Sequence, residues 1–246
     1  MSKVLIGVLG LFVVLAVIPL TVIAVSAPSS PPPMASMAGP LSRINFADLP
    51  TPRHFQARDG GVSAYMLDIR GHGGSRRRGD IDYIGQVDDD LADFARNLGP
   101  AKSGEVRTLI GFSAGAGFTI RFAGGPYGEL FDHYVFLSPI LPGAPTLRPN
   151  AGGWTSISNP RLLTISVLDD LGIHVFDGFD VISYAVSPTS KEGTSRYSYR
   201  LFRNFGAGRE FARYLKNIRR LAAVLVGSAD EQIVADQLLR CSKAWE

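Results

Sequence analysis

The feature that most constrains this chain is a serine between two glycines, in the stretch Gly111–Gly115 (G-F-S-A-G). An apolar run, Leu109–Ile110, precedes it, and small residues follow it. The pattern G-x-S-x-G places a serine on a sharp turn from a strand into a helix, with its hydroxyl pushed out of the sheet. The turn strains the serine backbone, and a side chain at either glycine would collide with the neighbouring strand or helix. Ser113 is therefore a candidate nucleophile, the alternative being a Gly/Ser turn without chemistry.

Length and composition favour one main domain. A chain of 246 residues with 46% hydrophobic and 19% charged residues can bury one sizeable core. The net charge of +3 is mild, and the arginines are dispersed apart from Arg76–Arg78 and the stretch Arg209–Arg220, so the pattern does not indicate nucleic-acid binding. Cys241 is the only cysteine, which excludes an internal disulfide and a cysteine-based metal cluster.

The sequence of the N-terminus predicts a membrane-spanning segment. Lys3 is followed by an uncharged apolar run, Val4–Val25, long enough to cross a hydrocarbon core of about 30 Å. A cleaved signal peptide is the alternative, because Val25–Ala27 resembles a cleavage site. The apolar run exceeds the usual signal-peptide length of about 7–15 residues, and Pro28 would follow the cut directly. We therefore predict that residues 1–27 are an uncleaved transmembrane helix.

The charges beside this segment predict its orientation. Lys3 precedes the apolar run and the next basic residue is Arg43, so the positive-inside rule places the N-terminus in the cytoplasm. The rest of the chain would lie on the non-cytoplasmic side of the cytoplasmic membrane. Residues 28–50 are predicted to be a linker, rich in Pro, Ser, Ala and Met as far as Pro40 and extended in character. Residues 51–246 would form the folded domain.

Short strands and one helix are predicted between the linker and Ser113. Residues 54–65 read as a hairpin that turns at Asp59–Gly61, and Met66–Ile69 as a further strand. Apolar residues then recur at helical spacing: Ile84, Val87, Leu91, Phe94 and Leu98. The acidic residues of this helix are expected to lie mostly on its solvated side, in preference to forming a metal site; they are Asp88, Asp89, Asp90 and Asp93.

Two more strands are predicted after Ser113. Tyr134–Pro139 reads as a short buried strand and a turn, and residues 222–226 as a strand that leads to Asp230. The proline-rich region between them has no clean period. Near its end the stretch Arg209–Arg220 reads as a basic helix with a solvated face, the alternative being contact with anionic lipid headgroups. Asp230 taken alone could be a helix N-cap.

The order of strand, D-I-R-G-H-G-G-S, acidic helix, strand and G-F-S-A-G resembles the α/β-hydrolase fold, in its serine aminopeptidase and lysophospholipase (monoacylglycerol lipase-like) branch. The resemblance covers most of Thr51 to Asp236 and implies an α/β architecture with a mostly parallel, here incomplete, sheet and a cap at about residues 142–216. It implies Ser113 as nucleophile, the Ala114 N–H as an oxyanion donor and Asp230 as the acid that orients a histidine. It also implies that His72 has a structural role and is not the catalytic base. It implies neither cofactor nor metal, and a small-molecule or lipid ester as substrate.

The chain departs from the family pattern in two places. The family order is Ser, Asp, His, yet all four histidines precede Asp230: His54, His72, His133 and His174. The oxyanion-loop segment that the family carries between Tyr65 and Met66 is also missing. Loss of one oxyanion donor costs about 10²–10³ in turnover, and loss of the histidine roughly 10⁶. These gaps predict an internally deleted and truncated product with little or no activity, unless His174 from the cap serves as the base.

Three functions compete. The first is a membrane-anchored serine hydrolase that acts on ester or acyl bonds, which the elbow and Asp230 favour. The second is a degenerate, non-catalytic hydrolase that serves as a membrane-tethered binding module, which the missing histidine favours. The third is a peripheral lipid-binding protein that uses the stretch Arg209–Arg220. The sequence predicts the first, and it leaves the substrate open because the cap has no readable pattern.

Overall fold

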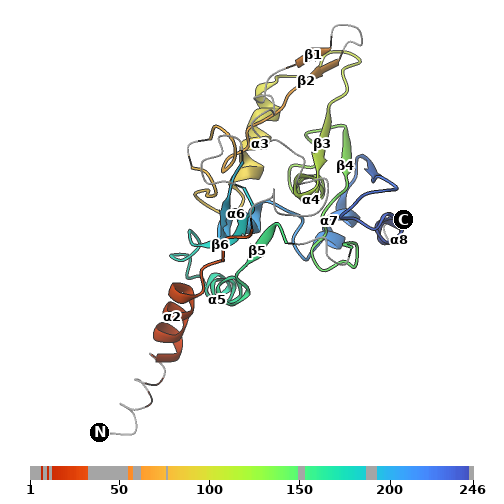
Figure 1. The fold of residues 1–246 in the computed structure, drawn as a ribbon. Coiled ribbons are helices and arrows are strands. Elements are labelled where there is room, and N and C mark those ends of the chain that lie inside the picture. Colours follow the sequence, from red (N-terminus) through yellow and green to blue (C-terminus); the bar gives the residue numbers. More distant parts are fainter. Residues whose placement is uncertain are drawn as a thin grey trace. The chain divides into compact units, whose positions relative to one another are not determined.

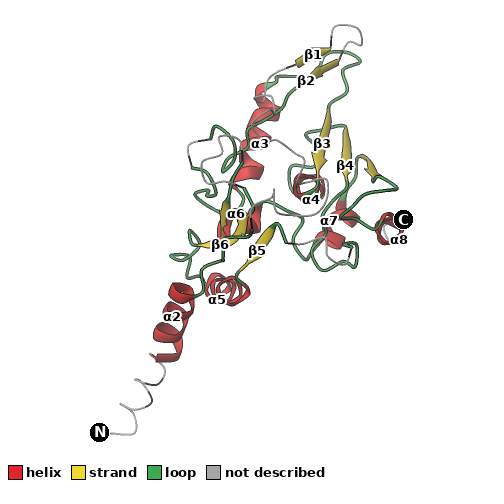
Figure 2. Cartoon of the chain, viewed as in Figure 1, coloured by secondary structure: helices red, strands yellow, loops and turns green. Residues whose placement is uncertain are grey.

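The computed structural model describes residues 7, 10, 13–32, 55–57, 62–75, 77–148, 153–186 and 193–243. The chain divides into two compact units, each built from two separate segments. Unit 1 comprises Met1–Ile81 and Gly153–Phe202, and unit 2 comprises Asp82–Gly152 and Arg203–Glu246. Figure 2 shows helices and strands in both units. Most of the predicted cap therefore groups with the N-terminal segment, whereas the serine turn belongs to unit 2.

Unit 2 contains a parallel three-stranded sheet. Its strands β3 (Thr108–Phe112), β4 (His133–Leu137) and β8 (Leu221–Leu225) lie in the order β3-β4-β8, with β4 in the centre. Thr108 pairs with His133, and His133 pairs with Leu221, so the three strands begin and end together. Parallel neighbours require a crossover connection, which helix α4 (Ala114–Ala123) supplies between β3 and β4. The predicted parallel α/β arrangement is confirmed in this unit.

Helix α4 covers one face of this sheet and forms the core of unit 2 with it. Figure 1 shows α4 beside β3 and β4. The helix residues Ala116, Phe118, Ile120 and Phe122 are buried, as are Tyr134 and Phe136 of β4. On β3, Ile110 and Phe112 point the other way and are 59% and 69% exposed, because successive side chains of a strand alternate between faces. The strand and helix predicted around Ser113 are both confirmed.

Helix α3 (Gln86–Asn97) matches the predicted amphipathic helix, with Val87, Leu91 and Ala95 buried. The expectation that its acidic residues face water is wrong for Asp88, which is only 8% exposed. Asp88 lies three residues before Leu91 and four before Ala92, both buried, so helical geometry places it on the apolar face.

Two further helices complete unit 2: α7 (Phe211–Asn217) and α8 (Ala235–Lys243). Helix α7 packs on α4, with Leu215 buried and the basic residues Arg213 and Lys216 exposed. A Cβ at Gly124 would lie 2.0 Å from the carbonyl oxygen of Tyr214, so the close approach of α7 requires a glycine there. The predicted basic helix is thus confirmed over its central part.

Unit 1 contains an antiparallel sheet, which corrects the expectation of an irregular cap. Strands β5 (Thr155–Ile157), β6 (Asp180–Tyr184) and β7 (Arg196–Ser198) lie in the order β5-β6-β7. Helix α5 (Asn159–Asp170) begins after Ser158, whose hydroxyl accepts a hydrogen bond from the Arg161 N–H. Helix α6 (Tyr199–Asn204) follows β7. Strands of three to five residues are too short to give a period in the sequence.

The two strands of the predicted hairpin are confirmed, its turn at Asp59–Gly61 lies outside the described residues, and the strand predicted at Met66–Ile69 does not form. Strand β1 (Phe55–Ala57) pairs antiparallel with β2 (Val62–Ala64), with Phe55 opposite Ala64. Residues 66–69 have no regular secondary structure and pair with no strand in the described part of the chain, and Met66 is 57% exposed. A strand is stabilised by its ladder of hydrogen bonds, so an apolar run without a partner stays a coil.

Within unit 1, the C-terminal part of the apolar N-terminal segment packs on helix α5. A π-helical turn, η1 (Val13–Val17), continues into α2 (Ile18–Val25), which lies beside α5 (Figure 1). Ile23 is 2% exposed and belongs to a core cluster with Ile165. Among the described residues, no helix has the length and apolar character that a membrane crossing needs. Residues 4–6, 8, 9, 11 and 12 of the predicted span, and residues 33–50 of the predicted linker, lie outside the described residues.

Candidate active site

Ser113 sits on a strained turn between β3 and α4. Its backbone has φ 56° and ψ −120°, a combination that residues with a side chain rarely adopt. Such strain costs about 1–3 kcal/mol and persists only where the surroundings enforce it. Here the Ser113 N–H donates to the Leu137 carbonyl over 2.9 Å, and its own carbonyl accepts from the N–H groups of Ala116 and Gly117. Strand β4 and helix α4 therefore both hold the serine in this conformation.

The glycines around Ser113 differ in what they contribute. A Cβ at Gly111 would lie 2.3 Å from Thr119 Oγ1 and 2.4 Å from the Gly115 carbonyl oxygen, so only glycine fits between β3 and α4. At Gly115 the nearest atom within reach is Phe205 Cζ, at 4.0 Å, which is ordinary contact. At Gly117 a Cβ would meet the Ala207 nitrogen at 2.9 Å. The predicted crowding is confirmed at Gly111 and wrong at Gly115, and Gly117 is the second crowded position.

The start of α4 offers a site for negative charge next to Ser113. Ala114 is the first residue of the helix, so its N–H has no preceding helical carbonyl to bond. The positive end of the helix dipole lies at the same place. The Ser113 side chain makes no hydrogen bond to any residue in the described part of the chain. A partly exposed hydroxyl beside a helix N-terminus is thus available to an incoming ligand.

Asp230 lies beyond β8, and both oxygens of its carboxylate accept hydrogen bonds. Its Oδ2 accepts a hydrogen bond from the Ser138 hydroxyl over 2.7 Å. Its Oδ1 accepts from the N–H groups of Gln232 and Ile233, over 2.9 and 2.8 Å. The two amide contacts close a turn, and α8 begins only at Ala235, so the helix N-cap that the sequence left open for Asp230 is wrong for this helix. Its role as a triad acid stays a prediction.

These partners keep Asp230 ionised. Burial favours the neutral acid, but the hydrogen bonds from Ser138, Ile233 and Gln232 and the charge of Arg148 outweigh it, and they lower the pKa of Asp230 below its usual value. The Arg148 guanidinium also donates to the backbone carbonyl of Asp230 over 2.8 Å. The geometry therefore supplies a fixed negative charge near the carboxyl ends of β4 and β8.

Ser138 is the site residue that the sequence interpretation missed. It follows β4 directly, has φ 43°, and its N–H donates to the Leu225 carbonyl at the end of β8 over 2.7 Å. Because the parallel strands end in register, Ser113 and Ser138 lie at the same edge of the sheet. The signal was a polar residue directly after a buried strand, in the same place relative to β4 as Ser113 is to β3.

No histidine of unit 2 is near Ser113. His133 is the one histidine in its sequence, and it begins β4, opposite Thr108, so it lies at the far end of the sheet from Ser113. His72 and His174 belong to unit 1, and His54 lies outside the described residues. In the described part of unit 2, no histidine side chain therefore lies beside Ser113 or Asp230.

His72 is held within unit 1 by two partners. Its Nε2 lies 2.6 Å from the Tyr197 hydroxyl and its Nδ1 lies 3.2 Å from the Arg70 carbonyl oxygen. Burial lowers the pKa of His72, although the Arg70 carbonyl and the charge of Asp68 oppose that shift. Asp68 itself closes the glycine-rich loop, since its carboxylate accepts a hydrogen bond from the Gly74 N–H over 3.0 Å.

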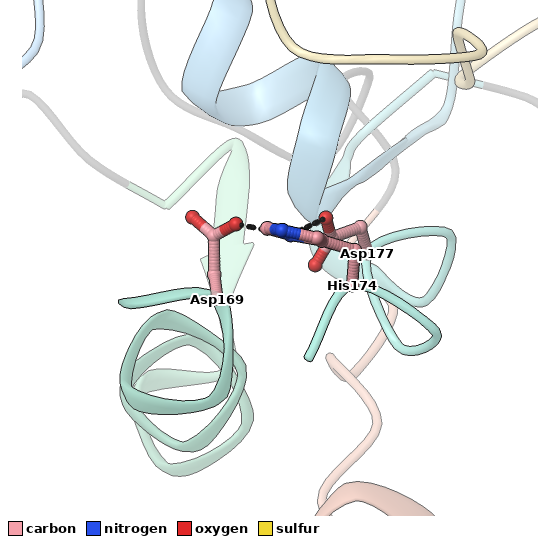
Figure 3. Close-up of side chains that lie close together, drawn as sticks. All are labelled: Asp169, His174 and Asp177. Atoms are coloured by element: carbon pink, nitrogen blue, oxygen red, sulfur yellow. Dashed lines mark hydrogen bonds and ion pairs between the residues drawn. The ribbon is translucent and has the colours of Figure 1, made fainter. Parts of the chain in front are cut away.

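His174 lies between two carboxylates at the end of α5, as Figure 3 shows. Its Nδ1 is 2.8 Å from Asp169 Oδ1 and 3.3 Å from Asp177 Oδ2. Burial, and then the charge of Asp169, raise the pKa of Asp177, while His174 opposes the shift. These three side chains are the one group of potential metal ligands in the described part of the chain. The sequence analysis named His174 but not the two acids.

Comparisons with known proteins cover most of the chain. The model of the family described as serine aminopeptidase, S33, matches residues 56–234. The crystal structure of Paleococcus ferrophilus monoacylglycerol lipase is similar, with a TM-score of 0.51 and 18% sequence identity, over 76% of this chain and 70% of that one. At this identity the likeness concerns the fold. No curated protein matches the chain.

Proposed function

Because the chain belongs to the S33 serine aminopeptidase family, of α/β-hydrolase fold, we propose that it is a serine hydrolase for ester or acyl bonds with Ser113 as its nucleophile. The observation that carries the proposal is the backbone of Ser113, held at φ 56° and ψ −120° between β3 and α4. Strain of this kind is retained where function requires it. The crowding at Gly111 enforces the same turn from the side of the sheet.

The chemistry that this turn supports is acyl transfer. Ser113 Oγ would attack the carbonyl carbon, and the Ala114 N–H would donate a hydrogen bond to the oxygen that becomes negative. The leaving alcohol departs, and water then releases the acyl group from Ser113. These steps use side chains, among them a base for the Ser113 proton, and a backbone amide, so the proposal includes no cofactor. Asp230 would supply the negative charge of a triad.

The step expected to limit the rate is transfer of the proton from the Ser113 hydroxyl to a base. Attack requires a base to accept that proton, and in the described part of unit 2 no imidazole is hydrogen-bonded to Ser113. A triad without its histidine loses roughly 10⁶ in turnover. We therefore expect turnover that is slow but measurable.

The proposed substrate is a small-molecule or lipid ester. The similar solved structure is that of a monoacylglycerol lipase, an enzyme whose name denotes a lipid ester. The family description instead names an aminopeptidase, which acts on an acyl–nitrogen bond. Both bonds present a carbonyl carbon to the serine, so the reaction class is the same.

The second candidate function is a non-catalytic binding module that keeps the hydrolase fold. The observation that favours it is the state of Asp230, whose two oxygens are both occupied, by Ser138 and by two backbone amides. A carboxylate engaged in this way has less capacity to orient a histidine. The two functions differ in whether Ser113 reacts.

Fluorophosphonate labelling of the full-length chain separates them, because such probes modify a serine whose hydroxyl is activated. We expect slow labelling that Ser113→Ala abolishes, whereas Ser103→Ala, an exposed serine in a loop, leaves it unchanged. Circular dichroism would show that each variant is folded. Absence of labelling in the folded wild type would overturn the hydrolase proposal and leave the binding module.

We further propose that the N-terminal segment, residues 1–27, anchors the chain in the cytoplasmic membrane with the remainder on the non-cytoplasmic side. Exposed apolar residues support membrane contact: Val14, Val17, Ile18 and Leu20 of the N-terminal helix are 43–57% exposed. On α5 the exposed residues Leu163 and Val167 continue to Leu171 at four-residue intervals. Such a row of apolar side chains suits a lipid surface.

Fractionation tests the anchor. The full chain is expected in the membrane pellet after an alkaline carbonate wash, and a chain that lacks residues 1–27 in the supernatant. Protease added to sealed inside-out vesicles should leave the domain intact. Recovery of the full chain in the soluble fraction would contradict the proposal.

A further inference from the structure

Three ligand-type side chains converge in unit 1, at the end of α5 and in the loop that follows it. Asp169 belongs to the last turn of α5, and His174 and Asp177 belong to the loop that leads to β6. One ligand atom from each lies within 4.8 Å of the other two. In Figure 3 the imidazole ring lies between the two carboxylates.

In this cluster two carboxylates share one hydrogen-bond donor from His174. His174 presents a single nitrogen, Nδ1, to both Asp169 Oδ1 and Asp177 Oδ2. Asp177 is only 6% exposed, and its second oxygen, Oδ1, is buried without a hydrogen-bond partner among the described residues. A buried carboxylate oxygen without a partner is costly, so its occurrence in a folded protein requires an explanation. A cation bound by both oxygens of Asp177 would supply one.

The spacing of the ligand atoms fits a metal in place of the shared proton. Metal bonds of about 2.0–2.2 Å put neighbouring ligand atoms roughly 2.9–3.5 Å apart in tetrahedral or octahedral geometry. The Nδ1 of His174 lies 2.8 Å from Asp169 Oδ1 and 3.3 Å from Asp177 Oδ2. The ligand atoms of the two acids lie within 4.8 Å of each other, so all three side chains would shift to bring their atoms to one ion. The His174 side chain is 63% exposed and has room to move.

A further contact fixes one of the acids. The Tyr199 hydroxyl donates to Asp169 Oδ2 over 2.9 Å, which leaves Oδ1 directed at His174. Tyr199 is fully buried at the start of α6. Hydrogen bonds of this kind orient the carboxylate ligands of metal sites and raise metal affinity.

We propose that Asp169, His174 and Asp177 bind a divalent transition-metal ion, with Zn²⁺ the best fit. One imidazole nitrogen with two carboxylate oxygens suits Zn²⁺, whereas Ca²⁺ takes six to eight oxygen ligands and Mg²⁺ prefers oxygens. The exposed side of His174 leaves room for water at the remaining positions. The ion would tie the end of α5 to the loop before β6 and, through Tyr199, to α6. The site is independent of Ser113 and of the proposed hydrolysis.

Calorimetric titration of the purified full-length chain with ZnCl₂ tests the site. We expect one Zn²⁺ per chain and binding at least about 100-fold weaker in His174→Ala. Because His174 is exposed, that variant should fold. The matched control is His133→Ala, which removes a histidine outside the cluster and should bind as wild type does. Tyr199→Phe keeps the ring and loses only the hydroxyl, and should weaken binding by about 10- to 100-fold.

Cobalt supplies a second readout that protein folding alone would not move. Co²⁺ bound in place of Zn²⁺ should give visible absorption bands in wild type and His133→Ala and none in His174→Ala. A tenfold excess of Mg²⁺ or Ca²⁺ should not displace it. Equal Zn²⁺ affinity in wild type and His174→Ala, or no binding at micromolar Zn²⁺, would overturn the site. Displacement by Mg²⁺ or Ca²⁺ would overturn the assignment to a transition metal.

Discussion

The hydroxyl of Ser138 donates a hydrogen bond to Asp230 Oδ2 over 2.7 Å and joins the end of β4 to the turn after β8. It is one of the contacts that lower the pKa of Asp230 against the opposing effect of burial. Ser138→Ala removes the donor without changing the backbone requirement at this position. We therefore expect a higher pKa for Asp230 in this variant, measured by NMR titration of the side-chain carboxyl carbon.

The control for this titration is Ser103→Ala, which changes an exposed loop serine and should leave the pKa of Asp230 where it is. An unchanged pKa in a folded Ser138→Ala chain would show that the hydroxyl does not stabilise the carboxylate.

The glycines that flank Ser113 should respond differently to the same substitution. Gly111→Ala places a Cβ 2.3 Å from Thr119 Oγ1 and 2.4 Å from a backbone oxygen, so α4 must shift away from β3. We expect it to lower the free energy of unfolding by about 1–3 kcal/mol, as overpacking does. Gly115→Ala meets its nearest atom at 4.0 Å and lies in a helix, where alanine is favoured by up to about 1 kcal/mol. Urea unfolding of both variants measures the difference, and equal destabilisation would contradict the geometry.

Asp88 and Arg121 form a nearly buried ion pair between α3 and α4. The Asp88 side chain is 11% exposed and that of Arg121 15%, and an Arg121 guanidinium nitrogen lies 2.8 Å from Asp88 Oδ2. The Asn204 side-chain amide also donates a hydrogen bond to Asp88 Oδ2 over 2.7 Å. Removal of one partner leaves a buried charge, so Asp88→Ala should cost about 3–5 kcal/mol of unfolding free energy. Asp93 pairs with Arg96 on the same helix, but these side chains are 70% and 54% exposed.

Asp93→Ala is therefore the matched control, with an expected cost of about 0.2–1 kcal/mol. Thermal or urea unfolding of the two variants checks the contrast. Similar costs for both would show that Asp88 is as well solvated as Asp93 is in the folded protein.

The ion pair between Asp80 and Arg200 should make the stability of unit 1 depend on pH. The Arg200 guanidinium donates to both oxygens of Asp80, over 2.7 and 2.6 Å. Burial raises the pKa of Asp80, but the Arg200 and Ser198 contacts outweigh it and bring the pKa below the ordinary value of 3.8. A lowered pKa stabilises the fold above pH 3.8, and this contribution is lost as the pH falls through the folded-state pKa.

Asp80→Asn removes this contribution. We expect the variant to be less stable than wild type at neutral pH, and the difference to shrink as the pH falls below 3.8. Urea unfolding at a series of pH values measures it. A difference that is constant with pH would show that Asp80 is not selectively stabilised in its ionised form.

The parts that were predictable from sequence are those with a local signal. The turn at Ser113 follows from two glycines around a serine, and α3 follows from apolar residues at helical spacing. The strands β5, β6 and β7 carried no such signal, because each is short and is stabilised by its partners in the sheet. The run Met66–Ile69 had a strand-like composition and no partner in the described residues.

The sequence by itself determined the family, the strand, turn and helix at Ser113, and the absence of a histidine after Asp230, since each depends on residue order or on contacts within a few positions. Only the tertiary structure decided that Ser138 bonds Asp230, that Asp88 is buried against Arg121, and that Asp169 and Asp177 meet at His174. The physical reason is that hydrogen bonds and burial depend on which elements pack together. Spacing along one element does not specify its neighbours.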